Sequence, residues 1–290
     1  MDWVGLSLVS AFLLAASDAL AKRAVHENNE YLVAWFRLIF TLPVLLPVFI
    51  IIPWPQLDRN FYFAFFIALP IELITVVLYI KALKLSPMSL TVPFLALTPV
   101  FLIVVSYLLL GEKVSAAGAA GIGLIALGSY LLNADGIKKS LLEPIRAIGR
   151  ERGSLYMIGV AMLYSITSSM GKMAIEHSSP LFFGSLYFIA INIAFIPIAL
   201  FMGRGHMQSF FSERKYRGLI VPGLLYGLMI LAHMSAMKLT RVAYMVSVKR
   251  TSLLMGVLFG YFMFREGNLR GRFFGAALMF AGFVLIVVSG

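Results

Sequence analysis

Two cations, Lys249 and Arg250, are adjacent in an apolar run that extends from residue 244 to residue 264 and is long enough to cross a membrane. Four more ionisable residues lie inside runs of this kind, namely Asp18, Arg37, Glu72 and His233. A charged side chain in hydrocarbon costs a few kcal/mol, so it usually faces a partner or a water-filled cavity. We therefore expect these residues to form ion pairs or to line a binding site.

Glu72 belongs to a polar pattern that occurs twice in the chain. Tyr79 follows Glu72 after seven residues, which places both side chains on one face of a helix. A shift of 154 residues gives Tyr226 and His233 as their equivalents in the second half. Each half therefore has polar side chains at the same two heights, as expected of a cavity lined by both halves.

The two acidic residues inside the runs each have two interpretations. Glu72 could bind and release a proton, or it could form a static ion pair with Arg37 or Lys249. Asp18 lies one run before Arg37 and near the same side of the membrane. We favour an ion pair between Asp18 and Arg37, and the alternative gives Asp18 a share in proton coupling.

A helical wheel separates the adjacent cations. At about 100° per residue, Lys249 shares a face with Ser252, whereas Arg250 points away from that face. The equivalent of Ser252 in the first half is Thr98, so this face is polar in both halves. We expect Lys249 to contact a substrate, and Arg250 to lie at the cavity edge, pair with Glu72 or cap a helix. The predicted substrate-binding residues are Lys249, Arg250, Ser252, Glu72, Tyr79, Tyr226, His233, Thr98 and Arg37.

The composition predicts an integral membrane protein. Of the 290 residues, 61% are hydrophobic and 13% are charged, whereas soluble domains are roughly half apolar and a quarter charged. The absence of cysteine excludes disulfides, thiolate metal sites and a thiol nucleophile. The net charge of +11 fits loops that face anionic lipids better than it fits nucleic-acid binding.

Ten apolar runs approach the length of about 20 residues that a helix needs to cross a membrane. They are residues 3–22, 31–52, 61–82, 88–110, 116–133, 155–174, 181–202, 218–237, 244–264 and 273–289. The weakest separation is the break at 84–87. A basic loop, 134–154, divides the chain into repeats 1–133 and 155–290. The predicted fold is therefore an all-α polytopic membrane protein with ten transmembrane helices in two five-helix repeats.

The two repeats resemble each other in sequence. With the shift of 154 residues, segment 82–114 aligns with 236–268 without a gap. Identical pairs include Ala82 and Ala236, Lys84 and Lys238, Leu85 and Leu239, Tyr107 and Tyr261, and Glu112 and Glu266. Because each repeat crosses the membrane an odd number of times, the two copies lie in opposite orientations. Transporters use such inverted repeats to expose a central site to one side at a time.

The positions of Lys and Arg predict the orientation. Five of them lie on the side that holds the termini and sixteen lie on the opposite side. The excess places loop 134–154 in the cytoplasm and both termini outside, and we expect the membrane to be the bacterial inner membrane.

The ends of the repeats carry a family resemblance. LGEKVSAAGAAGIGLIALGSYLL (110–132) and FREGNLRGRFFGAALMFAGFVLIV (264–287) each contain a glutamate, a short loop and a final helix with spaced glycines. Lys22 and Lys172 lie near the end of the first helix of each repeat, where long side chains can reach the headgroups. In these features the chain resembles the ten-helix EamA-like branch of the drug/metabolite transporter superfamily. The resemblance implies secondary transport, often export, of small metabolites, and it implies cytoplasmic termini, contrary to the charge count.

These observations together predict a secondary transporter. Cations outnumber carboxylates inside the runs, so the substrate is expected to be anionic or zwitterionic. The alternative is a flippase or scramblase for a lipid-linked phosphate or sugar, whose headgroup would suit the same cations. The chain has no HExxH, GxSxG or P-loop motif, so we expect neither enzymatic activity nor a cofactor or metal. The expected partners are a small-molecule substrate and membrane lipids, without nucleic acid, and the chain is expected to be a monomer or a homodimer.

Overall fold

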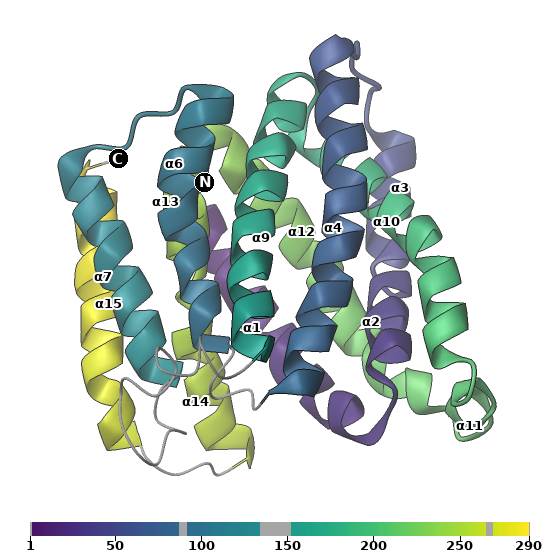
Figure 1. Ribbon diagram of the computed structural model, residues 1–290. Helices are drawn as coiled ribbons and strands as arrows, with labels where there is room; N and C mark the ends of the chain where they lie inside the picture. The colour runs from purple at the N-terminus through teal and green to yellow at the C-terminus, as the bar shows by residue number, and fades with distance from the viewer. Residues whose placement is uncertain (1, 87–91, 134–151, 265–268, 290) are drawn as a thin grey trace.

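The computed structural model describes residues 2–86, 92–133, 152–264 and 269–289, in which the regular elements are all helices joined by short loops (Figure 1). The first half contains α1 (Trp3–Glu27), α2 (Glu30–Ile39), α3 (Leu42–Ile51), α4 (Arg59–Leu85), the 3₁₀ helix η1 (Val92–Leu97), α6 (Thr98–Leu110) and α7 (Ala116–Asn133). The second half contains α9 (Arg152–Glu176), α10 (Pro180–Gly203), α11 (Met207–Ser212), η3 (Lys215–Leu219), α12 (Ile220–Leu239), α13 (Val242–Lys249), α14 (Ser252–Phe264) and α15 (Leu269–Ser289). Most of the predicted basic loop, 134–151, and the predicted break at residue 87 lie outside the described residues.

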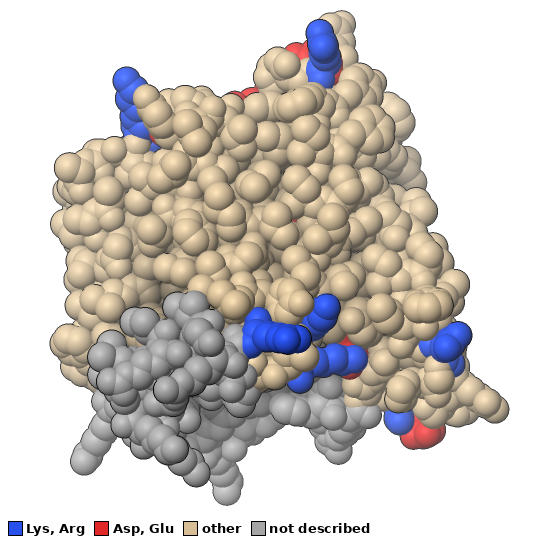
Figure 2. Space-filling view, viewed as in Figure 1, with Lys and Arg blue, Asp and Glu red and all other residues tan. Residues whose placement is uncertain are grey.

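Within the described residues, seven helical segments are long and apolar enough to cross a membrane. They are Trp3–Ala21, Glu30–Ile51, Arg59–Leu85, Arg152–Glu176, Pro180–Gly203, Lys215–Leu239 and Val242–Phe259. Three shorter apolar helices are Phe94–Leu110, Ala116–Leu132 and Phe273–Ser289. On the face shown in Figure 2, Lys and Arg side chains gather at the upper and lower edges, and an uncharged band lies between them. The chain is an integral membrane protein.

The second predicted helix, 31–52, is divided into α2 and α3 at Phe40 and Thr41. The predicted membrane span is confirmed as Glu30–Ile51, and the interruption within it is explained by Pro43, which follows the break. A proline has no N–H to donate, and its ring clashes with the carbonyl group four residues earlier. The Thr41 hydroxyl also donates to the carbonyl oxygen of Leu38 at 2.6 Å.

The predicted helix 244–264 is also divided, because α13 ends at Lys249 and α14 begins at Ser252. There is no proline in this segment. Instead, the hydroxyl of Thr251 donates to the carbonyl oxygen of Val248 at 2.8 Å. Such bonds from Ser or Thr to the preceding turn bend helices. The first half has its break at the same place, since α6 begins at Thr98, which is 154 residues before Ser252.

Helices of the first half pack mainly against helices of the second half. The most extensive contacts are those of α7 with α15, α4 with α9 and α1 with α12, and each pairs a helix of one half with a helix of the other. Helices α7 and α15 pack antiparallel, because Gly121 lies against Gly282 and Gly128 lies against Gly275. Since these two helices are equivalent in the repeats, the repeats are inverted relative to each other.

Candidate functional site

A cavity of about 370 Å³ lies between the two halves. Its wall is built by α1, α2, α4, η1 and α6 of the first half and by α9, α10, α12, α13 and α14 of the second half. The volume falls in the range of small-molecule pockets, roughly 300–1,000 Å³. The structure brings all the sequence-predicted site residues to this one cavity. They are Asp18, Arg37, Glu72, Tyr79, Thr98, Tyr226, His233, Lys249, Arg250 and Ser252.

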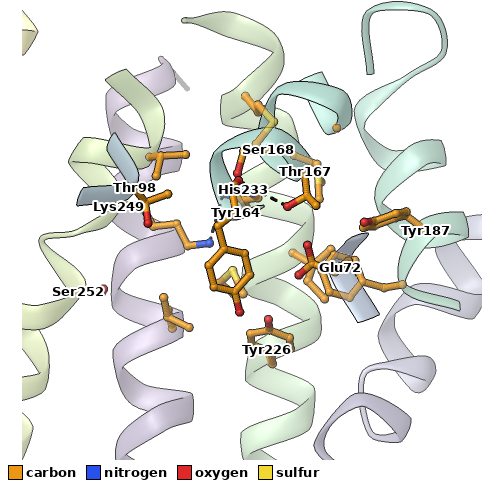
Figure 3. A pocket seen from close by; sticks show the side chains of 18 of the residues that line it. Glu72, Thr98, Tyr164, Thr167, Ser168, Tyr187, Tyr226, His233, Lys249 and Ser252 are labelled. Atoms are coloured by element: carbon orange, nitrogen blue, oxygen red, sulfur yellow. Dashed lines mark hydrogen bonds between the residues drawn. The ribbon is translucent and has the colours of Figure 1, made fainter. Parts of the chain in front are cut away.

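Both adjacent cations face the cavity, at the break between α13 and α14. Lys249 is the last residue of α13 and Arg250 is its C-cap, so Arg250 lies at the cavity, which is one of the three positions expected for it from the sequence. Nζ of Lys249 lies 3.4 Å from Nδ1 of His233, which is a hydrogen bond if Lys249 donates and His233 is neutral (Figure 3). Nε of Arg250 is buried and has no hydrogen-bond partner among the described residues.

Arg37 is neutralised inside the cavity. Its guanidinium donates to Oδ1 of Asp18 at 2.7 Å and to Oγ of Ser17 at 2.8 Å. The same guanidinium lies over the ring of Tyr226, with 4.4 Å between Cζ and the ring centre. The structure thus contains the ion pair that the sequence favours for Asp18 and Arg37.

Glu72 lies on the opposite wall of the cavity from Lys249, with Tyr164 and Tyr226 between them (Figure 3). Within the described part of the chain, Glu72 forms a direct ion pair with neither Arg37 nor Lys249. Its carboxyl group lies near the Thr167 side chain and within electrostatic range of Lys249. The static ion pair considered from the sequence is therefore not formed.

Several cavity residues on α9 and α10 are absent from the sequence prediction. They are Tyr164, Thr167, Ser168, Phe183, Tyr187 and Phe188. A signal for them exists, because a shift of 150 residues relates Lys22 to Lys172. The same shift relates Asp18 to Ser168 and Arg37 to Tyr187, so two predicted residues of the first half point to two cavity residues of the second.

The cavity contains an excess of positive charge and of hydrogen-bond donors. Three cations and two carboxylates line it. Four buried donor atoms at its wall have no partner within the described residues, and they are Nε of Arg37, Oγ1 of Thr98, the hydroxyl of Tyr187 and Nε of Arg250. Thr98 is only 2% exposed and Tyr187 only 5%. Such a wall is suited to a ligand that carries negative charge and several acceptor atoms.

The described residues contain no group of three or more His, Cys, Asp or Glu side chains placed to hold a metal ion. The cavity chemistry thus consists of cations, hydroxyl groups and aromatic rings. Such groups are suited to binding and orienting a small molecule.

Comparison with known proteins agrees with a chain built from two repeats. The EamA-like transporter family matches residues 1–134 and 151–288, which contain one repeat each. No curated protein matches the chain. A solved structure titled "Crystal structure of protein" has a TM-score of 0.75 and 14% sequence identity, and the match covers 98% of this chain and 97% of that chain. This likeness shows a shared fold. The chain belongs to the EamA-like transporter family.

Proposed function

We propose that the protein is a secondary transporter that exports a small organic anion or zwitterion by alternating access. The observation that carries the proposal is the cation pair Lys249 and Arg250, which faces a cavity lined by both inverted repeats. Arg37 has Asp18 as a partner, whereas Lys249 and Arg250 have no carboxylate in direct contact within the described residues. A carboxylate or phosphate group of the substrate would supply the missing charge.

The helix breaks add to this preference for an anion. Helices α6 and α14 begin beside the cavity, at Thr98 and Ser252. The N-terminus of a helix carries a partial positive charge, and half-helices in transporters direct such ends at anionic substrate groups. The two breaks would therefore act together with Lys249 and Arg250 on the same group.

The unpartnered donors favour a substrate with acceptors at more than one place. A buried donor without a partner costs about 1–3 kcal/mol, and a bound acceptor recovers that cost. Thr98 and Arg250 lie at the breaks, whereas Tyr187 lies beside Glu72 on the other wall (Figure 3). A hydroxy acid, a dicarboxylate or a sugar phosphate has this distribution of acceptors.

Glu72 is our candidate for proton coupling, and Asp18 is a second one. Glu72 is held away from direct contact with any cation, so its charge can change without breaking an ion pair. Asp18 neutralises Arg37, and its protonation would release that cation. Either event would link a proton to the charge of the cavity.

The proposal includes the membrane arrangement. The three shorter apolar helices cross the membrane as well, which gives ten crossings in two five-helix repeats. The distribution of Lys and Arg supports loop 134–154 in the cytoplasm and both termini outside. We place the protein in the bacterial inner membrane as a monomer or homodimer.

A thermal-shift screen of the purified protein against small organic anions tests the proposal. Each hit is then followed in liposomes, with and without a pH gradient. We expect at least one anion to be transported by the wild type and not by Lys249→Ala. The proposal fails if folded Lys249→Ala transports every hit at the wild-type rate. If neither the pH gradient nor Glu72→Gln changes the flux, proton coupling through Glu72 is rejected. Transfer of a labelled lipid between the two leaflets would favour a flippase.

A further inference from the structure

Lys172 is a buried cation at one end of the cavity. It lies next to Gly171, which lines the cavity, and its side chain is only 6% exposed. The interpretation of Lys172 as a lysine that reaches the lipid headgroups is therefore wrong, because its stem points into the protein. The loops at this end are residues 52–58, 111–115, 177–179 and 240–241, and we call this side the Lys172 face. It is the upper side in Figure 1.

The ammonium group of Lys172 is bound to the end of α12. Nζ donates to the carbonyl oxygens of Met237 at 2.6 Å, Thr240 at 3.0 Å and Lys238 at 3.4 Å. Glu176, one turn later on α9, supplies a carboxylate at 3.4 Å. The last carbonyl groups of a helix carry a partial negative charge and have no partners in the helix itself. Lys172 therefore ties α9 to the turn that joins α12 to α13.

The first repeat holds the same turn from its other side. Oε2 of Glu112 accepts a hydrogen bond from the backbone N–H of Val242 at 2.9 Å. The backbone N–H of Ser115 donates to the hydroxyl oxygen of Tyr244 at 3.2 Å. The start of α13 is thus bound to the first repeat while the end of α12 is bound to Lys172.

The two ends of the cavity differ in access. At the Lys172 face, Met237 lines the cavity, is 2% exposed and carries the carbonyl group to which Lys172 donates at the shortest distance. Toward the opposite face, the side chain of Asp18 is 56% exposed. The structure therefore represents a form that is closed at the Lys172 face.

We propose that Lys172 is the latch of a gate in the turn between α12 and α13, and that release of its bonds opens the cavity at the Lys172 face. The bonds join one side chain to carbonyl groups of a single turn, so they can break together. Water that enters the open gate would replace them as partners of the ammonium group. A modest difference in free energy then decides which form is populated. The inference extends the proposed alternating access, although its test requires no substrate.

The absence of cysteine from the natural chain allows a direct test. Ser168→Cys places one thiol at the cavity, and a membrane-impermeant maleimide applied from either side of sealed vesicles measures access to it. Gln56→Cys, in the exposed loop 52–58, reports which side of the membrane is the Lys172 face. The labelling rates are compared between the protein that retains Lys172 and the Lys172→Met variant.

We expect Lys172→Met to increase labelling of Ser168→Cys from the Lys172 face at least tenfold and to decrease labelling from the opposite face. The opposite changes are the signature of a gate, because one form is populated at the expense of the other. Lys113→Met, which removes an exposed lysine from the same face, should change neither rate. Lys172→Gln retains donors and should give an intermediate result, and it replaces Lys172→Met if the latter does not fold.

Two outcomes would overturn the proposal. Labelling that increases from both faces would mean that Lys172 only stabilises the fold, since a loosened protein admits reagent everywhere. Unchanged labelling from the Lys172 face in folded Lys172→Met or Lys172→Gln would show that the turn is held closed without the lysine. Both results are independent of whether the proposed substrate is correct.

Discussion

The two repeats are alike where they pack against each other and unlike where they line the cavity. In the contact of α7 with α15, Gly121 is equivalent to Gly275 and Gly128 is equivalent to Gly282. These four glycines meet crosswise, Gly121 with Gly282 and Gly128 with Gly275. At the cavity, by contrast, Leu95 is the equivalent of Lys249, Glu72 of Tyr226, and Arg37 of Tyr187.

The two regions differ because the contact of α7 with α15 must fit an equivalent helix, whereas the cavity must fit a small molecule. A contact between equivalent helices is self-complementary, so a side chain that fits one helix must also fit the other. A small molecule has no such symmetry, and its charged end needs cations on one wall only. The second repeat supplies Lys249 and Arg250, whereas the first has Leu95 and Ala96 at these places. Under the proposed function, we therefore expect specificity to lie in the positions where the repeats differ.

The largest effect should come from removing that difference. Lys249→Leu with Arg250→Ala gives the second repeat the residues of the first. A hydrogen bond to a charged group contributes about 1.5–3 kcal/mol, so the loss of either cation should weaken anion binding roughly 10- to 150-fold. Titration of the anion found in the thermal-shift screen measures this effect. Leu95→Ala, at the equivalent of Lys249, should change the dissociation constant little, and similar losses in both repeats would contradict the assignment.

The glycine contact should respond in the opposite way, with equal effects in both repeats. A Cβ atom at Gly128 would lie 2.5 Å from the carbonyl oxygen of Gly275, and one at Gly275 would lie 2.8 Å from that of Gly128. Both distances are too short, so each Ala variant should lose about 1–3 kcal/mol of stability and show a lower Tm. Gly123→Ala is the control in the same helix, because its Cβ meets nothing within 4 Å. A large difference between Gly128→Ala and Gly275→Ala would argue against the symmetric contact.

A smaller effect is expected at Asp18 and its equivalent, Ser168. Asp18→Asn removes the carboxylate that neutralises Arg37, but Asp18 is 56% exposed, so water screens the pair. We expect a loss of about 1 kcal/mol, measured as a fall in Tm. Adding Arg37→Gln should restore part of it, because no unpaired cation remains. Ser168→Ala should have less effect than Asp18→Asn, and the reverse order would show that the ion pair contributes nothing.

Sequence alone indicates much of the cavity because polar residues are rare in the apolar runs. Glu72 and Lys249 are recognisable for this reason, and both lie at the cavity. Tyr164 and Tyr187 are not recognisable in the same way, because tyrosine is common in membrane helices and also packs against other rings. The second shift, of 150 residues, relates Tyr187 to Arg37, whereas it relates Tyr164 to the apolar Leu14 and so gives no signal for Tyr164.

The local geometry of the helices was less accessible. A hydropathy profile treats 244–264 as one helix, although α13 ends at Lys249 and α14 begins at Ser252, with the Thr251 hydroxyl bonded to the carbonyl oxygen of Val248 between them. The burial of Lys172 was also not predictable, because a lysine near a helix end can equally reach the headgroups. Apart from Glu176, its partners are backbone carbonyl groups, which cannot be identified from the sequence.

The smallest effect is expected where the repeats touch at the Lys172 face. Nδ1 of His177 lies 2.6 Å from Oδ2 of Asp58. The shift of 150 residues gives Glu27 as the equivalent of His177 and Gln208 as the equivalent of Asp58, so the same pair of residues does not occur twice.

The backbone N–H of Phe61 and the side chain of His177 hold the pKa of Asp58 below its usual value of 3.8. A lowered pKa means that Asp58 stabilises the fold above the unfolded pKa and loses this contribution as pH falls through the folded pKa. Because Asp58 is more than half exposed, we expect Asp58→Ala to lower Tm only slightly near neutral pH, and to reduce the loss of Tm on acidification below pH 3.8. His177→Ala should give the same trend more weakly, since the bond from Phe61 remains. Identical acid dependence in Asp58→Ala and the wild type would show that this contact between the repeats does not contribute to stability.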